Sequence, residues 1–409
     1  MQRRVVVTGI GTITAAGADV QGLWRALLAG RDLIRPLRTF STPEMTNLYG
    51  AEVPPGIADA LPEGVDNNDN DGYRSRCARL ALTASRRALA AAGLHERREL
   101  LAEAALVLGT TLGEERQVGF LSDRWAAEGS ACVDGGFIER ADNHRLAALV
   151  ASACGLGGPV MLSATACASG NAALAWAYDL VAQGDVAIAL AGGADTFTRL
   201  IYNGFARMGA LAPTVCKPFD RNRNGVAFGE GAGMLVLESL EHARGRGVAI
   251  LGELAGYGIS NDAYHVTAPE PNGTGYVRAI EQALDHSGVA ASEIGYICAH
   301  GTGTPYNDAG EVRAIKAVFG ERASSIAISS PKSILGHTNG AAGALGSIVC
   351  ILALAEQKVP PTANLTEPDP EFGLDFVIGE ARSLALDSCL NVSAGFGGFN
   401  ACLVLRRAP

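Results

Sequence analysis

The feature that most constrains the fold of this chain is an internal repeat. Residues 88–113 read as a helix, a loop, a strand and a Gly-Thr turn, and residues 283–304 follow the same order. Residues 160–183 (VMLSATACASGNAALAWAYDLVAQ) and 326–357 (IAISSPKSILGHTNGAAGALGSIVCILALAEQ) each give a strand, a turn of small residues and a long helix. We therefore predict a duplicated fold with its internal boundary near residue 250.

The strands of this repeat predict an α/β fold. Runs such as RVVVTGI, AALVLGT and IGYICAH are apolar without alternation, which is typical of strands covered on both faces by helices. Amphipathic runs such as RLALTASRRALAAAGL lie between them and read as those helices. The pattern is mixed, with a substantial parallel component, and the chain should divide into residues 1–250 and 251–409.

Composition narrows the possible partners and the compartment. The chain has 409 residues, is 48% hydrophobic and carries a formal net charge of −9, a balance that argues against nucleic-acid binding. Its longest apolar runs are about half of the roughly 20 residues a membrane span needs. Nine cysteines, without a CxxC pair, argue against a disulfide framework or a metal site. We expect a cytoplasmic protein that contacts neither nucleic acid nor membrane.

Cys167 follows one repeated strand at the start of a helix, in the run SATACASGNAAL. One interpretation is a small buried thiol, as expected for most of the other cysteines. The other is a nucleophile, because a helix N-terminus favours a thiolate and its N–H groups can hold an oxyanion. The corresponding turn of the second repeat carries His337, so pseudo-twofold packing of the halves would bring the two residues together.

Three further positions hold polar side chains at the ends of apolar segments. His300 ends a buried strand in AHGTGT, and Lys332 follows another strand in SSPKSILGH. Glu311, in the next helical run, is a possible partner for Lys332. Each residue also has an ordinary structural interpretation: a hydrogen-bonded histidine, a surface lysine or a solvated helix face.

Taken together, these motifs resemble the β-ketoacyl-acyl-carrier-protein synthases, the condensing enzymes of the thiolase superfamily. The resemblance runs nearly end to end. Its motifs, in chain order, are VVVTGIGTITAAG, TACASG, AGGAD, KPFDRNRNGVAFGEGAGMLVLE, DAYHVTAPEPNG, AHGTGTPYND, SSPKSILGHTNGAAG, VPPTANL and GFGGFN. It implies a duplicated, five-layer αβαβα fold of the thiolase type, in agreement with the internal repeat.

The resemblance implies a role for each of five residues. Cys167 would be the acyl-accepting nucleophile in the N-terminal half. His300 and His337, in the C-terminal half, would complete a Cys-His-His triad. Lys332 would order the site with Glu311 as its partner. No metal and no cofactor would be needed, because the substrates are carried on the phosphopantetheine arm of an acyl carrier protein.

The same resemblance implies the walls of the substrate pocket. Phe396 of GFGG would be a gate, and its N–H would form an oxyanion hole with that of Cys167. Thr302 and Thr304 would contact the phosphopantetheine arm. Ala394 stands where the family commonly has an aromatic residue, so the packing beside the gate should be looser and admit a bulkier or stiffer chain.

The implied reaction is decarboxylative Claisen condensation of the Cys167-bound acyl chain with a malonyl carrier. The motif VSAGFGGFN favours type II polyketide or polyene synthesis over fatty-acid elongation, which is the alternative. A non-catalytic synthase subunit and a cysteine hydrolase are disfavoured. The chain would form a homodimer, or a heterodimer with a homologous chain-length factor. The candidate residues for docking an acidic carrier are Arg74, Arg76, Arg79, Arg207, Lys217, Arg221 and Arg223.

Overall fold

The central sheet contains the same five-strand arrangement twice. The computed structural model describes residues 3–39, 48–58, 75–133, 135–136 and 141–409. The N-terminal set, in spatial order, is β5 (Val160–Ser163), β4 (Ala105–Gly109), β6 (Ile188–Asp195), β8 (Gly231–Ser239) and β1 (Val5–Thr14). The C-terminal set is β11 (Ala327–Ser329), β10 (Ile294–Cys298), β15 (Ser388–Gly395), β16 (Phe399–Arg406) and β9 (Gly252–Asn261).

Both sets use one topology. In chain order within each half, the strands lie third, second, fourth, fifth and first. The second strand is parallel to the third and fourth, and the fifth is antiparallel to the fourth and first. The two sets join where β1 pairs with β9 at Val5–Leu254, and β13 (Asp375–Phe376) extends the far edge beside β11.

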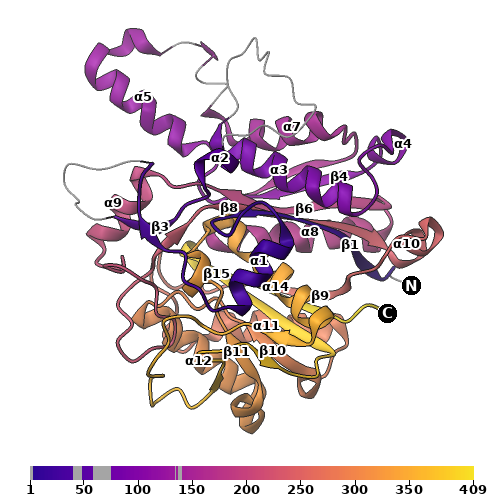
Figure 1. The fold of residues 1–409 in the computed structure, drawn as a ribbon, viewed down its shortest axis with the longest axis vertical. Helices are drawn as coiled ribbons and strands as arrows, with labels where there is room; N and C mark the ends of the chain where they lie inside the picture. Colours follow the sequence, from indigo (N-terminus) through magenta and orange to yellow (C-terminus); the bar gives the residue numbers. More distant parts are fainter. Residues whose placement is uncertain (1–2, 40–47, 59–74, 134, 137–140) are drawn as a thin grey trace.

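Three layers of helices cover the two sets of strands (Figure 1). The central pair is α8 (Ser169–Gln183) and α14 (Ala342–Glu356), which share one apolar core with strands of both halves. The outer helices of the N-terminal half are α3 (Arg76–Ala91) and α7 (Asn143–Cys154), and those of the C-terminal half are α11 (Thr274–Ser287) and α12 (Pro305–Phe319). This arrangement confirms the predicted duplicated αβαβα fold.

The two central helices meet through glycine. A Cβ on Gly170 of α8 would lie 2.7 Å from the backbone N of Ala344, and a Cβ on Gly343 of α14 would lie 2.7 Å from that of Asn171. These reciprocal contacts are close enough that a larger side chain would force the helices apart. The glycines therefore let the start of each helix approach the other, which also draws together the turns that precede them.

Helix α14 is unusually apolar because it lies in the core. Among the described residues, the stretch Asn339–Glu356 is long and apolar enough to cross a membrane, and 78% of it is buried inside the protein. A helix covered on both sides by sheets has no polar face to present to water, so its composition follows from its position.

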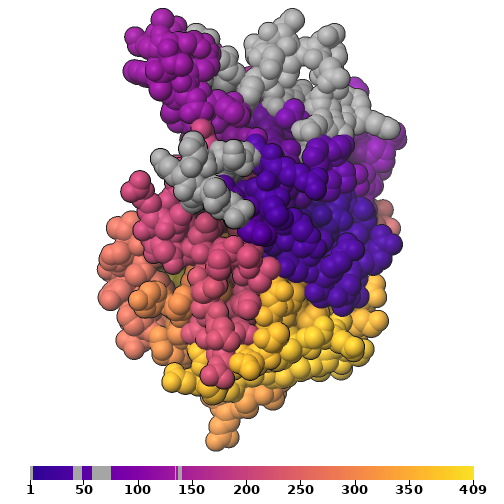
Figure 2. Space-filling model, turned by 60° about the vertical axis from the view of Figure 1, so that its left-hand side comes forward, coloured from indigo at the N-terminus to yellow at the C-terminus, as the bar shows by residue number. Residues whose placement is uncertain are grey.

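Helix α5 (Glu115–Glu128) contrasts with this core. It projects from the body of the protein, at the top of the views in Figures 1 and 2, and it contains no buried residue. Val118, Phe120 and Trp125 on it are 42%, 52% and 53% exposed.

Candidate active site

Cys167 lies in a strained turn between strand β5 and helix α8. The turn is the short helix η2 (Ala166–Ala168), and Ala166 has a φ of 49°. A left-handed conformation costs a non-glycine residue roughly 1–2 kcal/mol, so surrounding contacts must hold it. The Ser169 hydroxyl accepts a hydrogen bond from the Thr165 N–H at 2.9 Å and donates to the Ala166 carbonyl at 2.6 Å. Cys167 is thereby fixed at the N-terminus of α8.

The end of strand β15 comes unusually close to this turn. A Cβ on Gly395 would lie 2.9 Å from the Cys167 backbone N, so only glycine permits this approach. The backbone N–H groups of Cys167 and Phe396 both stabilise the charged form of the Cys167 side chain. The two N–H groups that the family resemblance assigns to an oxyanion hole therefore both act on the Cys167 sulfur.

The thiol of Cys167 is neutral in the free protein. Burial raises its pKa to about 12, and the charge of Asp195 adds to this rise. The charge of Lys332 and the two N–H groups lower the pKa but do not outweigh the loss of solvation. The helix N-terminus alone predicted a thiolate; desolvation is the stronger effect here, so the proton must leave as the sulfur reacts.

His300 and His337 face each other beside Cys167. His300 follows β10, and His337 follows the short helix α13 (Lys332–Leu335). Their ring centroids are 5.5 Å apart and the rings are nearly perpendicular, at 87°. Burial lowers the pKa of both imidazoles well below the usual value, and the Lys332 charge lowers them further. Both rings are therefore uncharged at neutral pH.

The hydrogen bonds of the two rings indicate which nitrogen carries the proton. Nδ1 of His300 lies 3.4 Å from the Lys332 Nζ, and Nδ1 of His337 accepts the Asn339 N–H at 3.3 Å. A nitrogen that accepts a hydrogen bond has no proton, so in each neutral ring the proton lies on Nε2. Among the described residues, the His337 Nε2 has no hydrogen-bond partner. The site thus offers two N–H donors to a bound molecule.

Glu311 supports the His300 loop through its backbone. Its carboxylate accepts the N–H groups of His300 at 2.7 Å and of Gly301 at 2.8 Å. Burial raises its pKa to about 7, and the nearby Lys332 charge counteracts this rise. The expected partnership with Lys332 is thus an attraction between charges, while the hydrogen bonds of Glu311 go to the loop.

Asp308 supports the same loop, and the sequence analysis missed it. It is fully buried, and it accepts the N–H groups of Phe219, Thr302 and Gly303 at 2.8, 3.1 and 3.2 Å. The signal available in the sequence was an acidic residue in AHGTGTPYNDAGE, one helical turn before Glu311. Both carboxylates therefore fix the loop that carries His300.

Cys167, His300 and His337 line one pocket of about 440 Å³. The pocket contains all of the predicted triad and substrate-binding positions: Cys167, His300, Thr302, Thr304, His337, Ala394 and Phe396. The hydroxyls of Thr302 and Thr304 are 2.8 Å apart, and Ala394 is 8% exposed. Lys332 and Glu311 lie behind the lining, where they act through His300 and its loop.

Phe396 stacks on a second aromatic residue that sequence reasoning did not find. Its ring lies parallel to that of Phe205 of α9 (Arg199–Arg207), at 5° with centroids 5.1 Å apart. Phe205 meets Phe228 edge-on at 4.9 Å, and Phe228 lies against the His337 ring at 6.2 Å. Aromatic contacts thus connect the expected gate to a triad residue.

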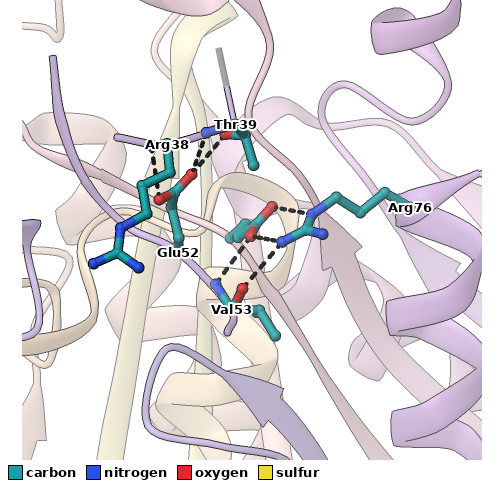
Figure 3. A network of polar contacts seen from close by, with 6 residues as sticks. Arg38, Thr39, Glu52, Val53 and Arg76 are labelled. Atoms are coloured by element: carbon teal, nitrogen blue, oxygen red, sulfur yellow. Dashed lines mark hydrogen bonds and ion pairs between the residues drawn. The ribbon is translucent and has the colours of Figure 1, made fainter. Parts of the chain in front are cut away.

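Arg76, one of the expected docking residues, is held inside the protein, which argues against a docking role. Its guanidinium is bound to the carboxylate of Glu230, its side chain is only 9% exposed, and it also donates to the Val53 carbonyl at 3.1 Å. Figure 3 shows this contact beside a second, half-buried carboxylate, that of Glu52, which accepts the Thr39 N–H at 2.9 Å. At the start of α3, where the sequence suggested a surface cation, Arg76 instead forms an internal ion pair with Glu230.

Arg223 is also committed within the protein. It pairs with Asp369 at 2.7 Å, lies over the Phe372 ring and is 10% exposed in its side chain, so it is a poor contact for a partner. Arg74 lies outside the described residues. Arg79 and Lys217 are half-buried, and Arg221 is exposed beside Glu367. Arg207 is exposed at the end of α9, next to pocket-lining Met208.

The cysteines form no disulfide in the described structure. All nine cysteines are unpaired, and seven of them are buried. Within the part of the chain that the structure describes, no group of three or more His, Cys, Asp or Glu side chains is placed to hold a metal ion.

Comparisons with known proteins agree with this geometry. The family model "Beta-ketoacyl synthase, N-terminal domain" matches residues 2–243, and "Beta-ketoacyl synthase, C-terminal domain" matches residues 251–366. The chain is 39% identical to "3-oxoacyl-[acyl-carrier-protein] synthase 2" of Synechocystis sp. over 99% of this chain and 98% of that protein.

A polyketide relative and a solved structure match equally well. The chain is 38% identical to "Putative polyketide beta-ketoacyl synthase 1" of Streptomyces halstedii over 99% of this chain and 98% of that protein. The solved structure "The ishigamide ketosynthase/chain length factor" has a TM-score of 0.94 and 39% identity, covering 100% of both chains.

Proposed function

Because the chain belongs to the β-ketoacyl synthase family, we propose that it extends acyl chains by decarboxylative Claisen condensation with a malonyl-acyl carrier protein. The observation that carries this proposal is the shared pocket of Cys167, His300 and His337, with two backbone N–H groups at the sulfur. The side-chain roles below are part of the proposal.

The first step transfers the acyl chain to Cys167. The sulfur attacks the carbonyl carbon of the acyl-carrier thioester, and the carbonyl oxygen becomes an oxyanion held by the N–H groups of Cys167 and Phe396. The bond to the carrier sulfur then breaks. The proton lost by the Cys167 thiol ends on the departing carrier thiol, so no net charge is left in the buried site.

The second step creates the carbon nucleophile. The malonyl carrier enters, the bond between the malonyl α-carbon and its carboxylate carbon breaks, and carbon dioxide leaves. The electron pair forms a thioester enolate, whose negative oxygen accepts hydrogen bonds from the Nε2–H groups of His300 and His337. Since both imidazoles are neutral, they stabilise this charge as hydrogen-bond donors.

The third step joins the two chains. The enolate carbon attacks the acyl thioester on Cys167, and the new oxyanion again lies at the N–H groups of Cys167 and Phe396. The bond from carbon to the Cys167 sulfur breaks, and the sulfur takes up one proton from water, which balances the negative charge that the malonyl carboxylate brought in. The β-ketoacyl product stays on the carrier. No metal and no redox cofactor takes part in this sequence.

Within the family we assign the chain to type II polyketide or polyene synthesis, with fatty-acid elongation as the alternative. Support comes from Ala394, a small residue lining the pocket beside Phe396, and from the similarity to the ishigamide ketosynthase structure. Condensation assays with saturated and polyunsaturated acyl carriers of equal length separate the two. We expect faster turnover of the polyunsaturated chain; a preference for the saturated chain would favour fatty-acid elongation.

The partners follow from the same chemistry. We propose that an acyl carrier protein docks at the exposed Arg207, beside the pocket, with Lys217 and Arg221 as further contacts. Arg207→Glu should raise the KM for the carrier and leave alkylation of Cys167 unchanged. Arg98→Glu, on helix α4 (Arg98–Leu101) across the molecule in Figure 1, is the matched control. An unchanged KM in the Arg207 variant would remove this residue from the docking surface.

The assembly and the compartment are also proposals. Strand β5 ends the sheet with Val160 and Met161, which are 43% and 36% exposed, and this edge can pair with a second copy or a homologous chain-length factor. Native mass spectrometry of the chain alone and with its co-expressed homologue would distinguish these. Nine unpaired cysteines suit a cytoplasmic enzyme. The two halves would be residues 1–250, with Cys167, and 251–409, with both histidines.

A further inference from the structure

The buried carboxylate of Asp195 lies between the loop that follows strand β4 and the turn that follows His337. We infer that Asp195 is a positioning residue that holds His337 in the orientation needed for malonyl decarboxylation. This inference rests on the proposed function and adds to it a residue from the N-terminal half that acts on a histidine of the C-terminal half. Within the described part of the chain, Asp195 forms no hydrogen bond with His337 and is not one of the residues that line the pocket, so its effect must pass through other groups.

Hydrogen bonds hold the Asp195 carboxylate through both of its oxygens. One oxygen accepts the N–H groups of Gly340 at 2.6 Å and Thr111 at 2.7 Å. The other accepts the Thr110 hydroxyl at 2.8 Å and the Leu112 N–H at 2.9 Å. The side chain is fully buried, and burial raises the pKa of its carboxyl group. The hydrogen-bond donors around it counteract this rise because they stabilise the ionised carboxylate. Asp195 ties the loop after β4 to the turn at Gly340.

Gly340 is connected to His337 through its neighbour Asn339. Gly340 belongs to the short helix η5 (Asn339–Ala341), and Asn339 has a left-handed φ of 49°. The Asn339 N–H is the group that donates to Nδ1 of His337 at 3.3 Å. Asp195 therefore holds Gly340, the neighbour of the strained Asn339. The Asn339 N–H in turn keeps the proton of His337 on Nε2.

Asp195 supports the function of His337 but opposes ionisation of the Cys167 thiol. Its negative charge raises the pKa of the Cys167 thiol. Removing the charge should therefore make the thiol easier to ionise, while removing the anchor should make His337 a poorer donor. A general loosening of the site would not produce effects of opposite direction on the two residues.

The test is Asp195→Asn, which keeps the shape but turns an N–H toward the Gly340 and Thr111 donors. We expect malonyl-carrier decarboxylation to fall at least about tenfold, because losing one oxyanion donor outright costs roughly a hundred- to a thousandfold. Alkylation of Cys167 by iodoacetamide at pH 7 should stay equal or become faster. Glu238→Gln is the matched control: Glu238 is also fully buried, binds Thr8 and Arg246, and should leave both rates unchanged.

Two further variants keep the test decisive if Asp195→Asn folds poorly. Asp195→Ser removes the charge without adding an opposed N–H and should show the same split. Asp195→Glu keeps the charge and should recover part of the decarboxylation rate. Decarboxylation within twofold of wild type, or equal losses of decarboxylation and alkylation in the charge-removing variants, would overturn the inference. If wild-type protein releases no carbon dioxide from malonyl carrier, the proposed function itself is wrong.

Discussion

The turn of Cys167 and its counterpart in the second half have the same backbone but different chemistry. Ala166 and Asn339 both have a φ of 49°, and each begins a three-residue 3-10 turn that leads into a helix of 15 residues. Counting from these residues, Gly340 stands where the other half has Cys167. The duplication therefore built two similar helix starts, and the next side chain decides what each one does.

The difference at this position explains why only one turn can carry a nucleophile. Cys167 is partly exposed to the pocket, where a substrate can reach its sulfur. A Cβ on Gly340 would lie 2.6 Å from the Asp195 Oδ2 and 2.6 Å from the Thr110 Cα. The second turn instead binds Asp195 and presents His337, two residues before Asn339. In the proposed mechanism, one turn supplies the nucleophile and the other supplies a hydrogen-bond donor.

The largest expected effect is that of removing the donor. His337→Ala should lower malonyl-carrier decarboxylation by roughly a hundred- to a thousandfold, because an enolate donor is lost. Acylation of Cys167 should change little, since its oxyanion uses backbone N–H groups. Carbon dioxide release and intact mass measure the two steps separately. Ala164→Ser, at the counterpart position, is the control and should leave decarboxylation and acylation unchanged. Loss of acylation with normal decarboxylation in His337→Ala would reverse the roles of the two turns.

The next effect is on stability. Gly340→Ala should lower the free energy of unfolding by about 1–3 kcal/mol, because a Cβ there overlaps with backbone and carboxylate atoms. Cys167→Ala, which shortens a side chain facing the pocket, should cost less. Urea unfolding of both variants measures the difference. Equal losses would mean that the two positions are packed alike.

The pH dependence of Cys167 sharpens the chemical side of the comparison. Since burial raises the thiol pKa to about 12, the alkylation rate of the free enzyme should rise about tenfold per pH unit from 6 to 9 without a plateau. Lys332→Met should slow alkylation at each pH, because the lysine charge lowers that pKa. A plateau near pH 7 would indicate a stable thiolate instead.

The smallest effect concerns the strain that both turns share. Ala166→Gly removes a left-handed alanine and should leave the free energy of unfolding unchanged or raise it by up to about 1 kcal/mol. Ala164→Gly, two residues earlier and without positive φ, should lower it by about 0.4–1 kcal/mol. Thermal unfolding distinguishes the signs. A loss at both positions would show that the Ala166 conformation carries no strain.

Much of this site could be predicted from local sequence. The repeat placed Cys167 and His337 on equivalent turns, and the strand end at His300 was visible as an apolar run followed by glycine. Asp195 could not be found in this way. It ends a fully buried strand, and its partners Thr110 and Gly340 lie 85 and 145 residues away in sequence.

Two other outcomes depend on the same kind of distant contact. Arg76 looked like a surface cation at a helix start, but its carboxylate partner, Glu230, is 154 residues away. Phe205 lies on a short amphipathic helix, where an aromatic residue is ordinary, and only the fold stacks it on Phe396. Local pattern locates strand ends and turns, whereas the partners of buried charges and rings are decided by how the halves pack.

The central claim is that Cys167, and not a side chain of the second turn, accepts the acyl chain. Intact-protein mass spectrometry after incubation with a panel of acyl carriers tests it most directly. The account predicts one added acyl group on the wild-type protein and on His337→Ala, and none on Cys167→Ala. An acyl group on folded Cys167→Ala would contradict the account.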